Sequence, residues 1–374
     1  MKISCTQENL SQGLNAVGHI ASKNLNLPIL SNILFKVENK NLTLMATNLE
    51  IGITTNIRGK IEGDGDFTVD AKLLANYISF LPKERIDLET DGDNIKVECQ
   101  NQKTKIKTQL AADFPLIPKL NKDNPCTVEA KLLKQAILEV VFACSASESR
   151  PELSGVLMEF AGNNIILAAT DSYRLAESRV SLIENKVGER KIIIPSKTMQ
   201  EVSRVLSSFK DEESIDGVDT IEIYIGESQI MFSYNNIDIV SRLIEGQYPD
   251  YKQIIPANFT GKTKINIAEL SKNIKASSLF AKNGIYDIKL DFSVPEYLTV
   301  TSSSVQAGEN VSQVKAEISG EKTNIILNYK YLLDGLQTMN SEDVEIEIID
   351  SNNPFLIRPA NRDDYFYIIM PIRQ

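Results

Sequence analysis

Three short stretches of this chain close alternating apolar runs in nearly the same way: Met45-Ala46-Thr47-Asn48, Ala168-Ala169-Thr170-Asp171 and Thr299-Val300-Thr301-Ser302. Thr170 follows Thr47 by 123 residues, and Thr301 follows Thr170 by 131 residues. A repeat of that length corresponds to a whole domain and is much longer than one unit of a solenoid. The spacing therefore predicts three copies of one domain within 374 residues.

Helical patterns recur in each copy at similar distances from these stretches. One amphipathic helix precedes each stretch, and a second follows it after more strand-like sequence. In the third helix, the spacing predicts that Leu132, Ile137, Val140 and Val141 are buried. The six helices are expected near residues 6–20, 70–80, 129–144, 196–209, 267–281 and 329–338.

The segments between the helices are typical of short strands. Ile221, Ile223 and Ile225 alternate with polar residues, which places them on one side of a strand. Each copy is expected to run β-α-β-β-β and then α-β-β-β. This order predicts an α+β fold of antiparallel sheets with two helices on one face. The proline-containing segments 113–118 and 245–251 are expected to link the copies.

Composition excludes several classes of protein. Hydrophobic residues make up 42% and charged residues 24% of the chain, which is ordinary for a soluble globular protein. No apolar run approaches the length of a membrane span, and the first residues lack the apolar core of a signal peptide. The four cysteines have no C-x-x-C spacing, which favours buried or incidental thiols in a reducing cytoplasm: Cys5, Cys99, Cys126 and Cys144.

Positive charge is concentrated in the predicted helices, although the formal net charge of the chain is −10. The helical windows hold 12 Lys and Arg and 7 Asp and Glu, so they carry +5 and the remainder carries −15. If the helices line one surface, that surface is basic and suits a polyanion held through its phosphates without base reading. A solvated helix face is the alternative explanation for any single lysine. The windows are residues 6–23, 70–83, 129–144, 195–210, 266–282 and 328–339.

No catalytic constellation can be assembled from the sequence. His19 is the only histidine, and no serine or cysteine triad, phosphate-binding glycine loop or zinc-type cluster is present. The acidic pairs Asp91/Asp93 and Asp363/Asp364 lie in turn-like sequence, where solvated turns are the simpler explanation. The chain is therefore predicted to be non-catalytic, with no cofactor and no metal.

Taken together, these features resemble the bacterial sliding clamps, the β subunit family of DNA polymerase III. The resemblance covers the whole chain and depends on the order and spacing of several motifs. They are Leu27-Pro28-Ile29-Leu30, Ala112-Asp113-Phe114-Pro115, residues 169–176, Tyr248-Pro249-Asp250-Tyr251 and Met370-Pro371-Ile372-Arg373. The resemblance implies clamp domains at 1–119, 126–249 and 257–374, and a head-to-tail dimeric ring with the helices inside.

The resemblance also implies a function and partners. The ring would encircle duplex DNA without sequence specificity and tether the replicative polymerase, which confers processivity. A hydrophobic groove between domains 2 and 3 would dock the polymerase III α subunit, the clamp loader, and other polymerases and repair proteins. Its walls would be Leu153, Thr170, Ser172, Tyr173, Arg174, Leu175, Pro249, Ile254, Ile368, Ile369, Met370, Pro371, Ile372 and Arg373.

Apolar walls suit a short extended peptide with large apolar anchors, and Arg174 and Arg373 are expected to bind its carbonyls or carboxylates. The dimer interface would contain Lys103, Lys105, Ile106, Leu279 and Phe280. Leu279 and Phe280 could instead belong to the core of the third copy. The residues expected to face DNA are Lys23, Asn24, Lys72, Ser147, Arg150, Lys197, Arg204, Lys272 and Lys275.

The chain departs from the family pattern in the groove. Ser172-Tyr173 stands where many relatives have Gly-His, and Gln253 and Gln374 replace basic and apolar residues, respectively. The ranking of partners is therefore open. Two rival functions are a repeated-domain hydrolase or transferase, which would need clustered titratable groups, and a protein-binding scaffold that binds no DNA.

Overall fold

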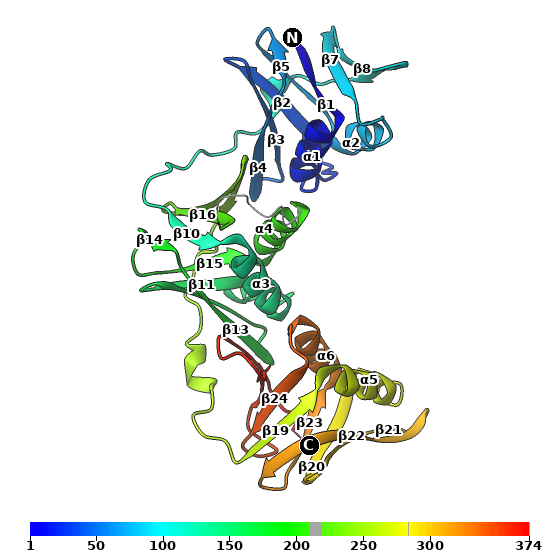
Figure 1. Ribbon diagram of the computed structural model, residues 1–374, viewed down its shortest axis with the longest axis vertical. Coiled ribbons are helices and arrows are strands. Elements are labelled where there is room, and N and C mark those ends of the chain that lie inside the picture. The colour runs from blue at the N-terminus through cyan, green and yellow to red at the C-terminus, as the bar shows by residue number, and fades with distance from the viewer. Residues whose placement is uncertain (148, 210–217, 283, 374) are drawn as a thin grey trace. The chain divides into compact units, whose positions relative to one another are not determined.

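The computed structural model describes residues 1–147, 149–209, 218–282 and 284–373, which contain six α-helices and 26 β-strands. All strand pairs among them, apart from isolated bridges, are antiparallel, so the predicted fold class is confirmed (Figure 1). The helices are α1 (Gln7–Gly18), α2 (Ala71–Ser79), α3 (Ala130–Val140), α4 (Ser196–Ser208), α5 (Ile267–Ser278) and α6 (Tyr329–Thr338).

The chain forms two compact units, and the middle repeat is divided between them. Unit 1 comprises Met1–Ala130, Ile183–Val187 and Arg204–Leu243. Unit 2 comprises Lys131–Leu182, Gly188–Ser203 and Ile244–Gln374. The division follows the sheets, because some strands of the middle repeat extend a sheet of the first repeat and others extend a sheet of the third.

Unit 1 contains two sheets, with α1 packed on β3 and β4 and against α2. The five-stranded sheet has the order β5 (Lys60–Glu62), β1 (Lys2–Thr6), β7 (Arg85–Asp91), β8 (Asn94–Cys99) and β9 (Gln102–Lys107). The nine-stranded sheet has the order β14 (Glu184–Asn185), β10 (Cys126–Glu129), β16 (Thr220–Ile225), β17 (Gln229–Tyr234), β18 (Ile237–Arg242), β4 (Ile51–Ile57), β3 (Asn41–Thr47), β2 (Asn32–Glu38) and β6 (Gly65–Asp70).

Unit 2 contains one sheet of twelve strands. Helix α5 packs on β20, β21 and β22 and against α6. The order begins β15 (Arg190–Pro195), β11 (Gly155–Ala161), β12 (Asn164–Thr170), β13 (Arg174–Ser181), β26 (Tyr365–Ile369) and β25 (Phe355–Pro359). It continues β24 (Asp343–Ile348), β19 (Gly261–Asn266), β22 (Gly308–Gly320), β21 (Tyr297–Ser304), β20 (Asp287–Val294) and β23 (Asn324–Asn328).

Several helices begin where a strand ends in a capping residue. The Asp70 carboxylate accepts a hydrogen bond from the amide of Leu73 at 2.7 Å, and Asn266 and Asn328 cap α5 and α6 in the same way. The strands β6, β15 and β23, each directly before the second helix of a repeat, were not predicted. Each continues straight into its helix, so no turn signal separates the two elements.

The buried stripe of α3 differs from the prediction at two residues, since Leu132 is exposed and Val141 is only partly buried and lies beyond the end of the helix. Leu132 is 44% exposed, and Leu133 is fully buried instead. The helix begins at Ala130, and the spacing from Leu133 through Ala136, Ile137 and Val140 places these residues on one face. The expected alternation in β16 holds for Ile221 and Ile223, which are buried.

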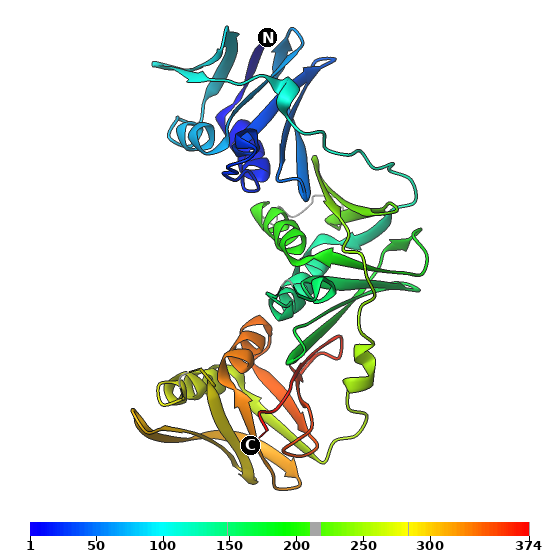
Figure 2. The same cartoon turned by 180° about the vertical axis from the view of Figure 1, so that it is seen from behind.

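Two strand pairings join the repeats, and we call them joint 1 and joint 2. In joint 1, β18 of the middle repeat pairs with β4 of the first, within unit 1. In joint 2, β13 of the middle repeat pairs with β26 of the third, within unit 2. In each unit the linker segment, 108–125 or 244–260, runs on the side of the sheet away from the helices (Figure 2).

Candidate functional site

Joint 2 brings together groove residues that lie almost 200 positions apart in the sequence. Leu175 on β13 is the register partner of Ile368 on β26, and Arg174 is the partner of Ile369. The amide of Met370 then donates to the carbonyl of Tyr173 at 2.8 Å, which extends the ladder past the end of β26. Residues 368–370 and the loop that ends at Arg174, both predicted to line the groove, therefore lie side by side.

The loop at the edge of joint 2 is held by its own side chains. The Thr170 hydroxyl donates to the carbonyl of Arg174 at 2.6 Å and accepts from the amide of Ser172 at 3.1 Å. The Asp171 carboxylate accepts from the amides of Tyr173 and Arg174 at 2.9 and 3.0 Å. Ser172 has φ +79°, a left-handed conformation that these bonds maintain. The loop is thus preformed, with the Tyr173 side chain 63% exposed.

The apolar side of joint 2 is a core cluster covered by the linker. Leu157, Ala168, Leu175, Tyr251, Leu356 and Ile368 form this cluster, and Tyr248, Ile255, Phe259 and Phe366 pack against it. The Tyr251 hydroxyl donates to the Glu177 carboxylate at 2.5 Å, and burial together with that carboxylate raises the pKa of the Tyr251 hydroxyl. Tyr251 therefore remains neutral and fixes the linker on the sheet.

The predicted groove residues divide into a buried base and an accessible rim. Leu153, Leu175, Ile368 and Ile369 are at most 2% exposed, so they support the surface from beneath. Thr170 is also buried. The residues with accessible side chains are Ser172, Tyr173, Pro249, Ile254, Met370, Pro371, Ile372 and Arg373. Gln374 lies outside the described residues.

Arg174, which was predicted to bind the peptide, is held by contacts within the chain. Its guanidinium donates to Asp171 at 3.0 Å and to Asp334 at 2.6 Å, and its side chain is only 12% exposed. It also stacks on the rings of Tyr331 and Phe142, with 4.5 and 5.5 Å to their centroids. These contacts commit Arg174 to holding β13 against α6, and leave Arg373 as the exposed arginine of the predicted set.

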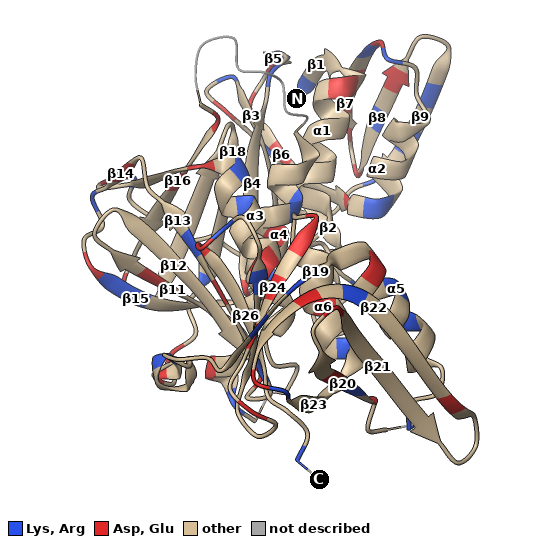
Figure 3. Ribbon diagram, turned by 60° about the horizontal axis from the view of Figure 1, so that its bottom comes forward, with Lys and Arg blue, Asp and Glu red and all other residues tan. Residues whose placement is uncertain are grey.

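Several residues predicted to face DNA are exposed, and some of the set also have contacts within the protein. Lys23, Lys72, Lys197, Lys272 and Lys275 are exposed. Lys272 and Lys275 both belong to α5, on which Figure 3 shows basic positions in blue. Asn24 is exposed but accepts from the amides of Asn26 and Leu27 to shape its loop. Ser147 is exposed and is hydrogen-bonded to Ser149.

Arg204 and Arg150 contact protein groups. Arg204 donates from the C-terminal end of α4 to the carbonyls of Asn15 and Ala16 in α1, at 3.2 and 2.8 Å, so it links the middle repeat to the first within unit 1. These bonds use part of the guanidinium that was predicted to face DNA. Arg150 donates to the Ser172 hydroxyl at 3.3 Å and to Glu152, which places it beside the loop of joint 2.

The residues predicted for the dimer interface differ in how accessible they are. Lys103 and Lys105 lie on the edge strand β9 and pair with Glu98 and Asp91 on the same sheet. Ile106 is only 6% exposed, because the alternation of β9 turns it toward the core. Leu279 is 75% exposed and Phe280 half-buried, so Leu279 is not part of the core of the third repeat.

Two exposed apolar residues of unit 1 were not among the predicted site residues. Leu73 is 55% exposed and Phe80 81% exposed, seven positions apart at the start and end of α2. The buried stripe of the same helix contains Ala71, Leu74 and Ile78. Leu73 and Phe80 are apolar residues outside this buried stripe. Their spacing can be recognised in the sequence, and exposed apolar residues of this kind often mark an interaction surface.

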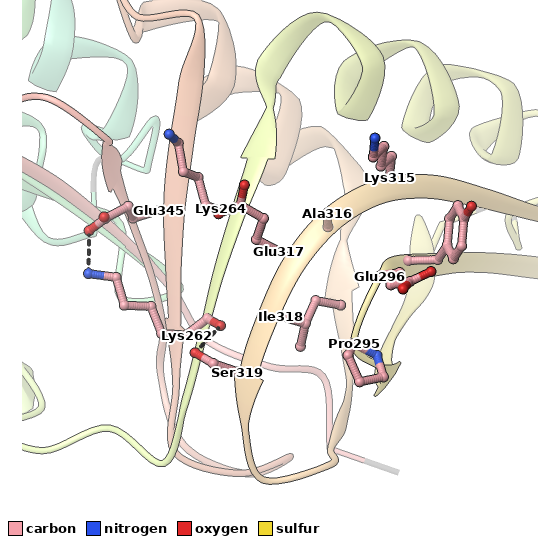
Figure 4. Close-up of a pocket in the computed structure, with 11 residues that line it drawn as sticks. Lys262, Lys264, Pro295, Glu296, Lys315, Ala316, Glu317, Ile318, Ser319 and Glu345 are labelled. Carbon is pink, nitrogen blue, oxygen red and sulfur yellow. Dashed lines mark hydrogen bonds and ion pairs between the residues drawn. The ribbon is translucent and has the colours of Figure 1, made fainter.

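A cavity of about 740 Å³ lies in unit 2. Its lining comes from β19, the turn 295–297, β22 and Glu345 (Figure 4). Lys262 pairs there with Glu345 at 2.8 Å. Within the described residues no group of His, Cys, Asp or Glu is arranged to hold a metal ion.

The other groups expected to be inert have structural partners. Asp364 accepts from Arg362 at 2.8 Å, and Asp91 pairs with Lys96 and Lys105. Burial raises the pKa of the Cys5 and Cys126 thiols to about 12. In the described parts of the chain, no helix combines the length and the apolar character needed to cross a bilayer.

Comparisons with known proteins agree with this arrangement. Three family profiles match in succession: the N-terminal domain of the DNA polymerase III beta subunit at residues 1–118, its central domain at 127–250 and its C-terminal domain at 252–373. A beta sliding clamp of Streptococcus pneumoniae is 30% identical over 376 residues, which covers 97% of this chain and 96% of that protein.

Solved structures are similar over the whole chain. A DNA polymerase III beta subunit from Thermotoga maritima has a TM-score of 0.92 at 29% identity and covers 100% of this chain and 99% of its own. A sliding clamp from Pseudomonas aeruginosa, determined bound to griselimycin, has a TM-score of 0.92 at 25% identity and covers both chains completely.

Proposed function

The chain belongs to the DNA polymerase III beta subunit family, the sliding clamps, and from this premise we propose how its residues carry out clamp function. It is a DNA sliding clamp that acts in replication. Its three domains are placed at residues 1–119, 126–249 and 257–374, and two copies form a head-to-tail ring around duplex DNA. The ring is a non-catalytic subunit of a polymerase holoenzyme, works in the cytoplasm and needs no cofactor.

Exposed lysines on the helices support DNA binding through the backbone. Lys72, Lys197, Lys272 and Lys275 come from three different helices, and Lys23 and Asn24 lie in a loop of the first domain. Lysine contacts to phosphates carry no sequence information, and they weaken as salt rises because counterions are released on binding. Such contacts hold a duplex loosely enough for the ring to move along it.

Two free sheet edges support ring closure. The β9 strand is the last of its sheet, and the first part of β22 pairs with β21 only, while Ala316–Gly320 pair with β19. A free edge of this kind is normally covered by another chain or protected from pairing. We place β9, Lys103, Lys105, Leu73 and Phe80 of one copy against β22, Leu279 and Phe280 of the next, with Glu309 and Glu317 as acidic partners.

The observation that carries the groove assignment is joint 2 itself. Its preformed loop, exposed Tyr173 and the tail from Met370 to Arg373 surround an apolar base, and this combination suits a short peptide with large apolar anchors. The polymerase α subunit, the clamp loader and other replication or repair proteins would dock here by such peptides.

Retention on circular DNA is the decisive test of the clamp. After loading by a cognate ATP-driven loader, the protein should stay on a closed plasmid during gel filtration in high salt. It should be lost once the plasmid is linearised, because the ring slides off an end. Equal retention on both forms would indicate ordinary affinity, and no retention on either would support a scaffold that binds no DNA.

The interface is tested by Leu279→Asp. A carboxylate at this apolar contact should weaken the dimer by at least about tenfold, or about 1.4 kcal/mol, as followed by sedimentation velocity. Leu25→Asp is the matched control, because Leu25 is fully exposed and outside the proposed interface. A Leu279→Asp protein that dimerises as well as the control would contradict the placement.

A further inference from the structure

Joint 1 repeats the loop of joint 2 bond for bond. The Thr47 hydroxyl donates to the carbonyl of Ile51 at 2.9 Å and accepts from the amide of Leu49 at 3.0 Å. The Asn48 side-chain oxygen accepts from the amides of Glu50 and Ile51, at 3.1 and 2.8 Å. Leu49 has φ +78° and Ser172, at the same place in joint 2, has φ +79°. The two loops share one conformation.

The strand added beside each loop is also equivalent. In joint 1, Val240 is the register partner of Gly52 and Ser241 the partner of Ile51, as Ile368 is of Leu175 and Ile369 of Arg174 in joint 2. The amide of Arg242 donates to the carbonyl of Glu50 at 3.2 Å, as that of Met370 does to the carbonyl of Tyr173. Joint 1 is therefore a second copy of the framework that forms the groove.

Joint 1 has an open cavity of about 250 Å³ at this position. Gly52 stands where joint 2 has Leu175, and the Ile117 side chain of the linker packs over it, 2.6 Å from where a Cβ would be. The cavity remains beside Ile117. It is lined by Thr47, Leu49, Glu50, Ile51, Gly52, Leu116, Ile117, Pro118, Gln229, Val240, Ser241 and Arg242.

The rim of this cavity exposes apolar side chains at an energetic cost. Leu49 is 45% exposed and Leu116 96% exposed. Leucine rarely adopts a left-handed backbone, and holding it there costs of order 1–3 kcal/mol, whereas Asn would adopt it readily. A strained residue that presents its side chain to solvent is explained if that side chain contacts a partner.

We propose that joint 1 is a second docking site, which binds a short extended peptide segment of a partner protein through one or two large apolar side chains. The inference rests on the proposed function of joint 2, whose framework it shares. The anchor enters the cavity between Leu49 and Leu116, and Arg242 at the rim binds a peptide carbonyl. The cavity is smaller than the roughly 300–1,000 Å³ of drug-sized sites, which limits it to few anchors.

Calorimetric titration of the full-length protein tests this site. The probe is a neutral five-residue peptide with Leu, Phe and Leu between two Ser residues, added to about 1 mM. Two binding sites per chain are expected. Leu49→Asn should remove one of them, with at least about tenfold weaker binding there, while the thermal unfolding temperature stays equal or rises because the strain is relieved.

Two further variants separate this inference from the function proposed for joint 2. Tyr173→Asp should remove the other site only, and Leu25→Asp should change neither. The proposal of a second site would be overturned if the protein bound one peptide per chain and this binding survived Leu49→Asn. It would also be overturned if Leu49→Asn had no effect on binding at the highest peptide concentration. Loss with Leu49→Asn but none with Tyr173→Asp would instead contradict the groove at joint 2.

Discussion

Joint 1 and joint 2 extend a sheet from one repeat to the next in the same way, yet they are fastened by different chemistry. At joint 1, the Asn236 amide donates to the Thr55 hydroxyl and the Asn56 carbonyl, at 3.1 and 2.6 Å. At joint 2, the fully buried Glu139 carboxylate accepts from Arg362 at 2.7 Å, and Arg174 pairs with Asp334. Ion pairs fasten joint 2, whereas at joint 1 the Asn236 amide binds neutral hydroxyl and carbonyl oxygens.

The difference shows what a functional groove requires of its support. A buried ion pair adds little net stability, since desolvation offsets the attraction, but it fixes one arrangement and penalises others. The Glu139 carboxylate also accepts from the Ser178 hydroxyl at 2.7 Å on β13, so α3 and β13 are fixed to the turn that carries Arg362. The ion pairs thereby hold the rim of joint 2 in position for a partner.

Arg362→Ala should cause the largest change in stability, and it should act on joint 2. It leaves the Glu139 carboxylate buried without its cation, which should reduce the free energy of unfolding by about 3–5 kcal/mol in urea denaturation. Lys264→Ala is the control, since its pair with Asp343 is partly exposed and should contribute about 0–1 kcal/mol. Replacing both Glu139 and Arg362 by Met should recover most of the loss. A single variant as stable as the control would show that joint 2 does not depend on the pair.

Gly52→Ala should have the next largest effect and act on joint 1. The added methyl would meet Ile117 at 2.6 Å and must displace the linker, at a cost of about 1–3 kcal/mol in the same measurement. Ile117→Ala combined with Gly52→Ala should be less destabilising than the sum of the two changes, because the clash is removed. Additive losses would mean that Ile117 does not pack over Gly52 in solution.

Acid should have the smallest effect and should act on joint 2 first. The hydrogen bond from Arg362 lowers the pKa of Asp364, so its contribution to stability is present above the usual aspartate pKa and is lost as pH falls through the folded value. Amide exchange at Ile368 and Ile369 should therefore speed up, relative to Val240 on β18, as pH falls from about 5 to about 3. The bonds of joint 1 between Asn236, Thr55 and Asn56 do not titrate. Equal changes at both joints would contradict this account.

The sequence predicts most of the framework because its signals are local. All six helices were expected, and the structure shows Asp70, Asn266 and Asn328 as the N-caps of three of them. The groove residues also gather as predicted, since the threefold repeat fixes which strand edges can meet. The strands β6, β15 and β23 were missed because a strand that passes directly into a helix has no turn residues to mark its end.

Single side chains were harder to place because their orientation depends on distant partners. Arg174 could not be assigned to Asp334, or Arg204 to the carbonyls of α1, without knowing which helices pack together. The burial of Ile106 in the single chain could not be predicted for a similar reason, because alternation gives two faces of a strand but not which one is buried. Leu73 and Phe80, by contrast, could have been predicted as exposed apolar residues, because their spacing places them outside the buried stripe of α2.

Strand β26 sits between β13 and β25, with register partners on both sides. A polymerase held at Met370–Arg373 would pull on this strand as it moves. The tension would spread through the backbone ladders of β26 into β13 of the middle repeat and β25 of the third. The tether is thus anchored to a strand that is paired on both sides, so a steady load would be shared by two repeats.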